Sequence, residues 1–206
     1  MLQNRVDPQG NIIKTSARGL WMGNRGQLHD DQQNVVRRFK LKAWLTCLLE
    51  FNSRKREVMA PNRYTELFFL DEATAFSAGH RPCFECRRED YNRFKYCWLK
   101  GNHEYGFDNK TSVREIDNIL HRERIDSAGE KITYQDNPEN LPDGTFILFH
   151  SRPYLIANKL MYGWSPSGYD IVIDLPKLKK VIVLTPKSIV HAFRAGYKPQ
   201  MAIVNK

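Results

Sequence analysis

The sequence predicts an α+β fold, in which a small β-hairpin and helix module precedes a mixed sheet with flanking helices. Three observations lead to this prediction. Short segments in both halves carry alternating or continuous apolar residues, as strands do. Other segments carry apolar residues at helical spacing, with capping residues before them and glycine after them. A Cys-x-x-C pair, Cys83 and Cys86, stands directly before one of these helices.

Strands are expected in the first part of the chain. Residues 1–33 show little periodicity and are expected to be mostly irregular. They include an ordered loop over 18–26, where three glycines allow backbone angles that other residues avoid. Asn52 to Lys55 suits a hairpin turn between two strands. Strands are predicted over 39–51, 56–59 and 64–70.

Two helices flank the Cys pair. Asp71 is a typical N-cap for a short helix over 72–78, which Gly79 ends in the left-handed conformation. A longer helix is predicted over 87–99, because apolar residues recur there at helical spacing and mark a buried face. The residues of that face are Tyr91, Phe94, Cys97 and Trp98.

The second half combines strands with terminal helices. A helix is expected over 112–123, and a last helix begins at Thr185 and Pro186 and ends at Gly196. A tight loop is expected over 164–169. Strands are predicted over 145–149, 153–156, 171–174 and 181–184. The organisation expected is a metal-binding region over 1–105 and an α+β region over 106–206, or one continuous domain.

Two segments of the chain resemble each other. Residues 75–82 read Ala-Phe-Ser-Ala-Gly-His-Arg-Pro, and residues 192–199 read Ala-Phe-Arg-Ala-Gly-Tyr-Lys-Pro. The second segment has no cysteines after it. We therefore interpret the shared segment as a device that ends a helix, to which Cys83 and Cys86 add chemistry.

The charge of the chain favours an anionic partner. The 206 residues carry a formal net charge of +9, and residues 1–60 hold 11 Lys and Arg against 5 Asp and Glu. A localised basic excess favours a polyanion, with nucleic acid first, although it also suits a solubilising surface. The residues predicted to contact phosphates are Arg37, Arg38, Lys40, Arg54, Lys55, Arg56, Arg87 and Arg88.

The amino terminus and the apolar runs predict a cytoplasmic protein. The first residues lack the apolar core of a secretory signal, and runs such as 67–70 are far too short to span a membrane. Thiols stay reduced in the cytoplasm. A Cys pair there indicates a metal-binding or catalytic site rather than a disulfide.

Cys83 and Cys86 supply half of a tetrahedral metal site. Two intervening residues let both sulfurs bind one ion, with zinc the best candidate. The following helix N-terminus and the basic residues Arg87 and Arg88 favour the thiolate form. The alternative is a pair of incidental, partly buried thiols.

The remaining ligands are less constrained. Cys97 is excluded, because eleven helical residues separate it from Cys86, roughly 16 Å along the axis. Cys47 is the expected third ligand, with a core cysteine as the alternative. His29 is the preferred fourth ligand. The other candidates for that position are His80, His103 and water.

Residues 69–87, which end in Ala-Gly-His-Arg-Pro-Cys-Phe-Glu-Cys-Arg, resemble the zinc-binding module of the Ada-type DNA methylphosphotriester repair proteins. The resemblance implies that Cys83 and Cys86 bind zinc and that the module contacts DNA. That family uses four cysteines, one of them as a methyl acceptor. Ala43 and Phe51 stand where a fourth cysteine would be expected around Cys47. A longer pattern, made of residues 18–29 together with residues 64–75, also resembles a small bacterial family.

These observations predict a zinc-binding protein that binds nucleic acid, DNA favoured, through a basic surface beside the Cys-x-x-C site. Two alternatives remain open. One is a zinc-dependent hydrolase or transferase with an open metal position. The other is a structural zinc that supports a protein-interaction surface.

Overall fold

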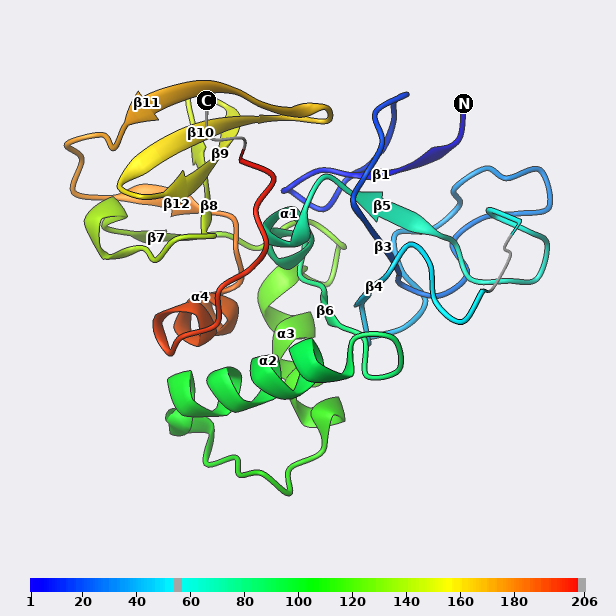
Figure 1. The fold of residues 1–206 in the computed structure, drawn as a ribbon, viewed down its shortest axis with the longest axis horizontal. Helices are drawn as coiled ribbons and strands as arrows, with labels where there is room; N and C mark the ends of the chain where they lie inside the picture. The colour runs from blue at the N-terminus through cyan, green and yellow to red at the C-terminus, as the bar shows by residue number, and fades with distance from the viewer. Residues whose placement is uncertain (54–56, 204–206) are drawn as a thin grey trace.

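The computed structural model describes residues 1–53 and 57–203 and confirms the α+β fold. Two six-stranded sheets lie beside each other, with α1 (Glu72–Ser77) between them and the other helices along one end (Figure 1). The other α-helices are α2 (Arg88–Gly101), α3 (Val113–Arg124) and α4 (Lys187–Arg194). Short 3-10 helices span His103–Tyr105 and Pro138–Asn140.

The first sheet is built from the first 82 residues and has the strand order β2-β1-β5-β3-β4-β6. Its strands are β1 (Gln3–Val6), β2 (Ile12–Lys14), β3 (Trp21–Asn24), β4 (Leu45–Cys47), β5 (Leu67–Phe69) and β6 (Arg81–Pro82). Both β1 and β3 pair with β5, which lies more than forty residues away in the sequence.

The structure of this region corrects three predictions. The region 1–33 contains three strands rather than irregular chain, because short strands with distant partners leave no local periodicity. The long strand predicted over 39–51 is reduced to the three residues of β4. Residues 57–59 do not form a strand; Val58 and Met59 lie in a turn. Residues 54–56, part of the expected turn and strand, lie outside the described residues.

The second sheet has the order β11-β10-β9-β8-β12-β7 and is antiparallel throughout. Its strands are β7 (Tyr134–Asp136), β8 (Phe146–Phe149), β9 (Arg152–Ala157), β10 (Leu160–Ser165), β11 (Gly168–Asp174) and β12 (Val181–Val183). Strands β8, β9, β11 and β12 match predicted segments. The loop expected over 164–169 is instead the end of the β10–β11 hairpin, where Ser165 pairs with Gly168.

Helix α1 links the two sheets and the helices. All six of its residues are buried. Ala75 packs with the first sheet, Ala73 packs with the second, and Phe76 joins a core formed by α2, α3 and α4. The boundary predicted near residue 105 therefore falls within one packed helical core. Among the described helices, none has the length and apolar character needed to cross a bilayer.

The repeated segment ends two helices in the same way. Gly79 and Gly196 both have positive φ angles, 86° and 116°. The amide of His80 donates to the carbonyl of Ala75 at 2.9 Å, and the amide of Tyr197 donates to that of Ala192 at 3.1 Å. Both rings are almost fully buried. The segment is thus a helix terminator, as the sequence predicts.

Candidate metal centre

Backbone pairing in the first sheet brings Cys47 and Cys83 together. Strands β4 and β6 run parallel, and Thr46 lies opposite Pro82. The pairing continues by one hydrogen bond of 2.9 Å, from the amide of Cys83 to the carbonyl of Thr46. Cys47 is the next residue of β4, so both thiols leave the same end of the strand pair.

A tight turn adds Cys86 to this pair. The turn over 83–86 closes with a hydrogen bond of 3.1 Å from the amide of Arg87 to the carbonyl of Cys83, and α2 begins one residue later. The sulfurs of Cys47, Cys83 and Cys86 lie within 4.8 Å of one another. Sulfurs around a tetrahedral zinc ion, with zinc–sulfur bonds near 2.3 Å, are separated by about 3.8 Å. The three thiols therefore form a group that could hold a metal ion.

One sulfur of this group, that of Cys83, is stabilised as a thiolate, whereas hydrogen bonding to Cys83 and burial raise the pKa of Cys47 and of Cys86. Hydrogen bonds from the thiols of Cys47 and Cys86 lower the pKa of Cys83, and the amides of Glu85 and Cys86 contribute to that decrease. The amide of Leu48 donates to the sulfur of Cys86. Donors aimed at sulfur favour the thiolate, which is the form that binds metal. The three sulfurs could therefore hold a metal ion, whose binding would release the protons of the other two thiols.

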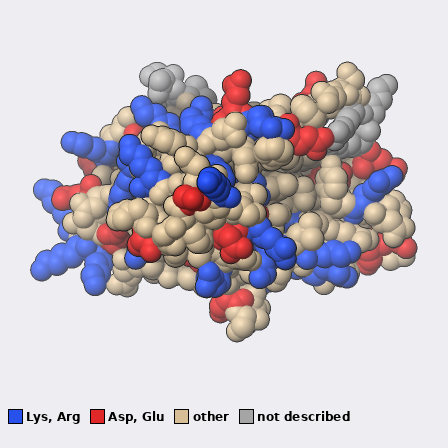
Figure 2. All heavy atoms as spheres, turned by 90° about the horizontal axis from the view of Figure 1, so that it is seen from below, with Lys and Arg blue, Asp and Glu red and all other residues tan. Residues whose placement is uncertain are grey.

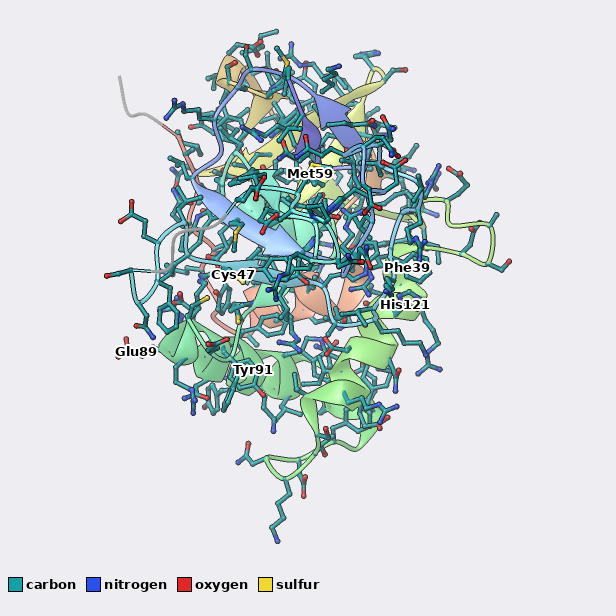
Figure 3. All side chains as sticks on the ribbon, turned by 90° about the vertical axis from the view of Figure 1, so that its right-hand side faces the viewer. Phe39, Cys47, Met59, Glu89, Tyr91 and His121 are labelled. Carbon is teal, nitrogen blue, oxygen red and sulfur yellow. The ribbon has the colours of Figure 1, made fainter. Side chains whose placement is uncertain are left out.

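The surroundings of the sulfurs are apolar on the inner side and open on the outer side. Cys47 and Cys83 are each 8 % exposed and pack with Met22, while Cys86 is more accessible. Phe84, between the two cysteines of the turn, is 49 % exposed. In Figure 3, Cys47 lies above the first turn of α2, which carries Glu89 and Tyr91.

His29 does not belong to this group, which corrects the prediction that it is the fourth ligand. Its Nε2 lies 3.2 Å from the carbonyl of Ala60, and its Nδ1 lies 2.6 Å from the hydroxyl of Thr65. A carbonyl only accepts, so Nε2 carries the proton and Nδ1 accepts from the hydroxyl. Neither nitrogen has a lone pair left for a metal ion. His29 is a buried structural residue.

The other candidate ligands also lie elsewhere. His80 is buried against Trp44 and Phe69, and its Nε2 accepts a hydrogen bond from Arg25 at 3.3 Å. His103 begins the 3-10 helix at the far end of α2. Cys97 packs in the helical core, as predicted. Among the described residues, no His, Asp, Glu or further Cys joins the three thiols in one group.

Arg87 corrects the predicted nucleic-acid surface. Its side chain is 2 % exposed and forms ion pairs with Glu72 and Asp90. It also donates to the hydroxyl of Thr46 at 2.9 Å. A guanidinium so enclosed holds α2 against α1 and β4 and does not reach a phosphate. The acidic residue three positions later, Asp90, is the sequence signal that could have indicated this pairing.

The other predicted cations divide into separate groups. Arg88 is exposed next to the thiols, and its guanidinium lies 3.5 Å from the centre of the Phe84 ring. Arg37, Arg38 and Lys40 are exposed on the segment that contains Phe39, which lies on the opposite side of Figure 3 from Cys47. Arg54, Lys55 and Arg56 lie outside the described residues. The face shown in Figure 2 carries basic and acidic side chains interspersed.

Sequence reasoning missed the residues that position the sulfurs through their backbone, Thr46 and Leu48. Their only sequence signal is that they flank Cys47. No protein-family model, curated protein or solved structure matches this chain. The class of site is therefore defined by its geometry alone: a reduced three-cysteine group with the spacing and hydrogen bonding of a metal centre.

Proposed function

We propose that this chain is a zinc protein in which Cys47, Cys83 and Cys86 hold the ion and a fourth coordination position is left to water or an external ligand. The observation that carries the proposal is the convergence of three sulfurs from two strands and a turn. Structural zinc sites use four protein ligands, whereas sites with three protein ligands keep a position open.

The sequence of the undescribed residues supports an open position. Residues 54–56 are Arg-Lys-Arg and residues 204–206 are Val-Asn-Lys, none of which is a usual zinc ligand. A bound zinc ion would act as a Lewis acid on whatever group occupies the fourth position. The chain itself contributes three thiolates, the amides that stabilise them and the apolar packing around Met22.

Cobalt substitution tests the open position. We expect the cobalt-loaded protein to show thiolate-to-cobalt absorption that changes when imidazole or a small thiol is added. A matched variant, Cys97→Ser, removes a cysteine from the core and is expected to give the same spectrum. A spectrum unaffected by either additive would indicate a closed site with a fourth protein ligand and would overturn the open-position proposal.

Nucleic-acid binding is a second candidate function, favoured by one feature of the same site. Phe84 is exposed between two of the thiols, and Arg88 is stacked over its ring. An exposed aromatic ring beside an arginine suits base stacking and phosphate contact. The net charge of +9 supports a polyanion partner in general.

Salt dependence of binding tests this second function. We expect single-stranded DNA to bind at low salt with an affinity that falls steeply as salt rises. Phe84→Ala is expected to weaken binding by about tenfold, since one stacked base contributes about 1–3 kcal/mol. Tyr96, which is 62 % exposed on α2, provides the control variant Tyr96→Ala. Absence of binding at low salt would contradict the nucleic-acid function and would not affect the zinc proposal.

A further inference from the structure

A second group of unusual residues lies away from the thiols, around Trp44. The guanidinium carbon of Arg25 lies 3.9 Å from the centre of the Trp44 ring, and that of Arg124 lies 3.8 Å from it. Both arginines are almost completely buried, with 2 % and 1 % of their surfaces exposed. Lys131 approaches the same region and donates to the carbonyl of Ser77. Two buried cations and the half-buried Lys131 thus converge on one region.

These cations have hydrogen-bond donors left over. Arg25 donates to the carbonyl of Gly10 at 3.0 Å and to His80, but its Nη2 is buried with no hydrogen-bond partner among the described residues. The same holds for Nε of Arg124, whose other nitrogens bind carbonyl oxygens of Gly79 and Lys42. Buried donors without partners are rare in proteins, and they indicate a missing acceptor.

The nearby carboxylates compensate this charge only in part, through Asp7 and Asp117. Asp117 is held by Arg81 in a buried two-point ion pair, with both distances 2.7 Å. Glu130 pairs with Arg38 on the surface. Asp7 accepts from the amide and side chain of Asn11. Burial accordingly lowers the pKa of Arg25 to about 9 and that of Lys131 to about 7. The group carries an excess of positive charge, on the buried Arg25 and Arg124 and the half-buried Lys131.

A cavity leads to these residues from the surface. Its volume is about 370 Å³, within the range of small-molecule sites. The wall combines apolar side chains, Val35 and Val36, with the cations Arg37 and Arg38. A second recess of about 20 Å³ lies beyond it and is bordered by Arg124 and Lys131. Gly10, Asn11, Arg25 and Arg38 border both spaces.

We propose that this cavity binds a phosphorylated small molecule, with its phosphate group against Arg25 and Arg38 and one phosphate oxygen in the recess beside Arg124 and Lys131. The recess has room for one water-sized atom, since about 10–15 Å³ suffices for a water molecule. The larger cavity accommodates the rest of the phosphate and an organic group against Val35 and Val36. This site is independent of the proposed metal function.

Phosphate fits better than a carboxylate for two reasons. Its charge of about −2 matches more of the positive charge of Arg25, Arg124 and Lys131 than a single carboxylate charge does. Its tetrahedral oxygens can enter the recess and face Arg25 and Arg38 at the same time, and arginine suits phosphate through its fork of donors. The donors now left unpaired would gain an acceptor.

Thermal unfolding and calorimetry with inorganic phosphate and pyrophosphate test the proposal. We expect either anion to raise the melting temperature of the wild-type protein, whereas chloride at equal ionic strength does not. Lys131→Met removes one cation of the group without emptying its half-buried position, so the variant is expected to fold and to bind pyrophosphate at least tenfold more weakly. Lys110→Met, at an exposed lysine on the loop before α3, is expected to bind like wild type.

Further arms identify the source of the phosphate and its location. Cys86→Ser is expected to retain the pyrophosphate response, which excludes binding at an open metal position. An oligonucleotide without a terminal phosphate is expected not to displace pyrophosphate. Displacement by it would assign the cavity to a nucleic-acid surface and overturn the small-molecule proposal. No response in the wild type would also overturn it, as would an undiminished response in both Lys131→Met and Arg25→Lys.

Discussion

The amide of Cys83 lies 2.9 Å from the carbonyl of Thr46, to which it donates a hydrogen bond. This contact continues the parallel pairing of β4 and β6 and sets Cys83 beside Cys47. Two of the three sulfurs are therefore positioned by sheet backbone, and the third by a turn leading into α2. Since backbone pairing does not require the thiols, serine substitutions are expected to remove metal binding while the sheet remains.

His29→Ala is expected to lower stability without removing the metal. The substitution leaves the carbonyl of Ala60 without its partner and removes the acceptor of the Thr65 hydroxyl. An unsatisfied buried group costs about 1–3 kcal/mol. Urea denaturation should show this loss in the free energy of unfolding, and metal content should equal that of wild type. Loss of zinc from the folded variant would indicate that His29 is a metal ligand and contradict this assignment.

Arg87→Gln is expected to lower the stability of the protein, whereas Arg88→Gln is expected to affect only DNA binding. Arg87 is the buried partner of Glu72, so its loss should cost about 3–5 kcal/mol in the free energy of unfolding. Arg88 is exposed, so its loss should change stability by less than about 0.5 kcal/mol. If DNA binds, only Arg88→Gln should reduce the dependence of affinity on salt. Equal stability of the two variants would contradict the burial of the Arg87 ion pair.

Alanine at the two terminator glycines provides a matched comparison. A Cβ at Gly79 would lie 2.5 Å from Cδ of Arg124, whereas a Cβ at Gly196 meets nothing within 4 Å. Both positions have positive φ, which costs about 1–2 kcal/mol for alanine. Gly79→Ala should therefore be the more destabilising by about 1–3 kcal/mol, the added cost of crowding. Similar losses at both positions would show that Arg124 moves away freely.

Lys131 gives the protein a dependence of stability on pH. Burial and the neighbouring charge of Arg25 lower its pKa from 10.5 to about 7, Arg124 lowers it further, and Asp7 opposes the shift. Between pH 7 and 10.5 the unfolded chain binds the Lys131 proton and the folded chain releases it, so stability rises with pH. Below pH 7 both states are protonated and the contribution is constant.

Comparison with Lys131→Met isolates that contribution. From pH 7 to pH 10 the free energy of unfolding of wild type is expected to rise relative to the variant by about 3–4 kcal/mol, since each unit of pKa difference corresponds to about 1.4 kcal/mol. Chemical denaturation at several pH values measures the difference in the free energy of unfolding between wild type and variant. Contributions from cysteines and tyrosines are common to both proteins and cancel in this difference. Parallel curves would mean that Lys131 keeps its proton in the folded protein, and that its charge is already compensated.

Local signals predicted the helices and the three cysteines of the candidate metal site. Asp71 accepts from the amide of Thr74 as an N-cap, and the face of α2 is buried as its spacing indicates. Cys47 joins Cys83 and Cys86. In each case neighbouring residues or cysteine chemistry carried the information.

Distant contacts explain what the sequence did not reveal. Strand β1 pairs with β5 across more than sixty residues, and no local pattern encodes that choice of partner. His29 has the chemistry of a ligand, but Thr65, thirty-six positions away, occupies its nitrogen. A count of basic residues assumes that each one is exposed. It therefore could not show that Arg87 is buried in an ion pair. The cation group around Trp44 joins residues from three separate segments in the same way.

Metal analysis of the purified, reduced protein tests the central claim most directly. Elemental analysis should find one zinc ion per chain in the wild type and in Cys97→Ser, whose thiol lies in the helical core. Cys47→Ser, Cys83→Ser and Cys86→Ser should each lose the ion while remaining folded. A wild-type protein that contains no metal and takes up none when zinc is supplied, or an ion retained by all three serine variants, would contradict a three-thiolate zinc centre.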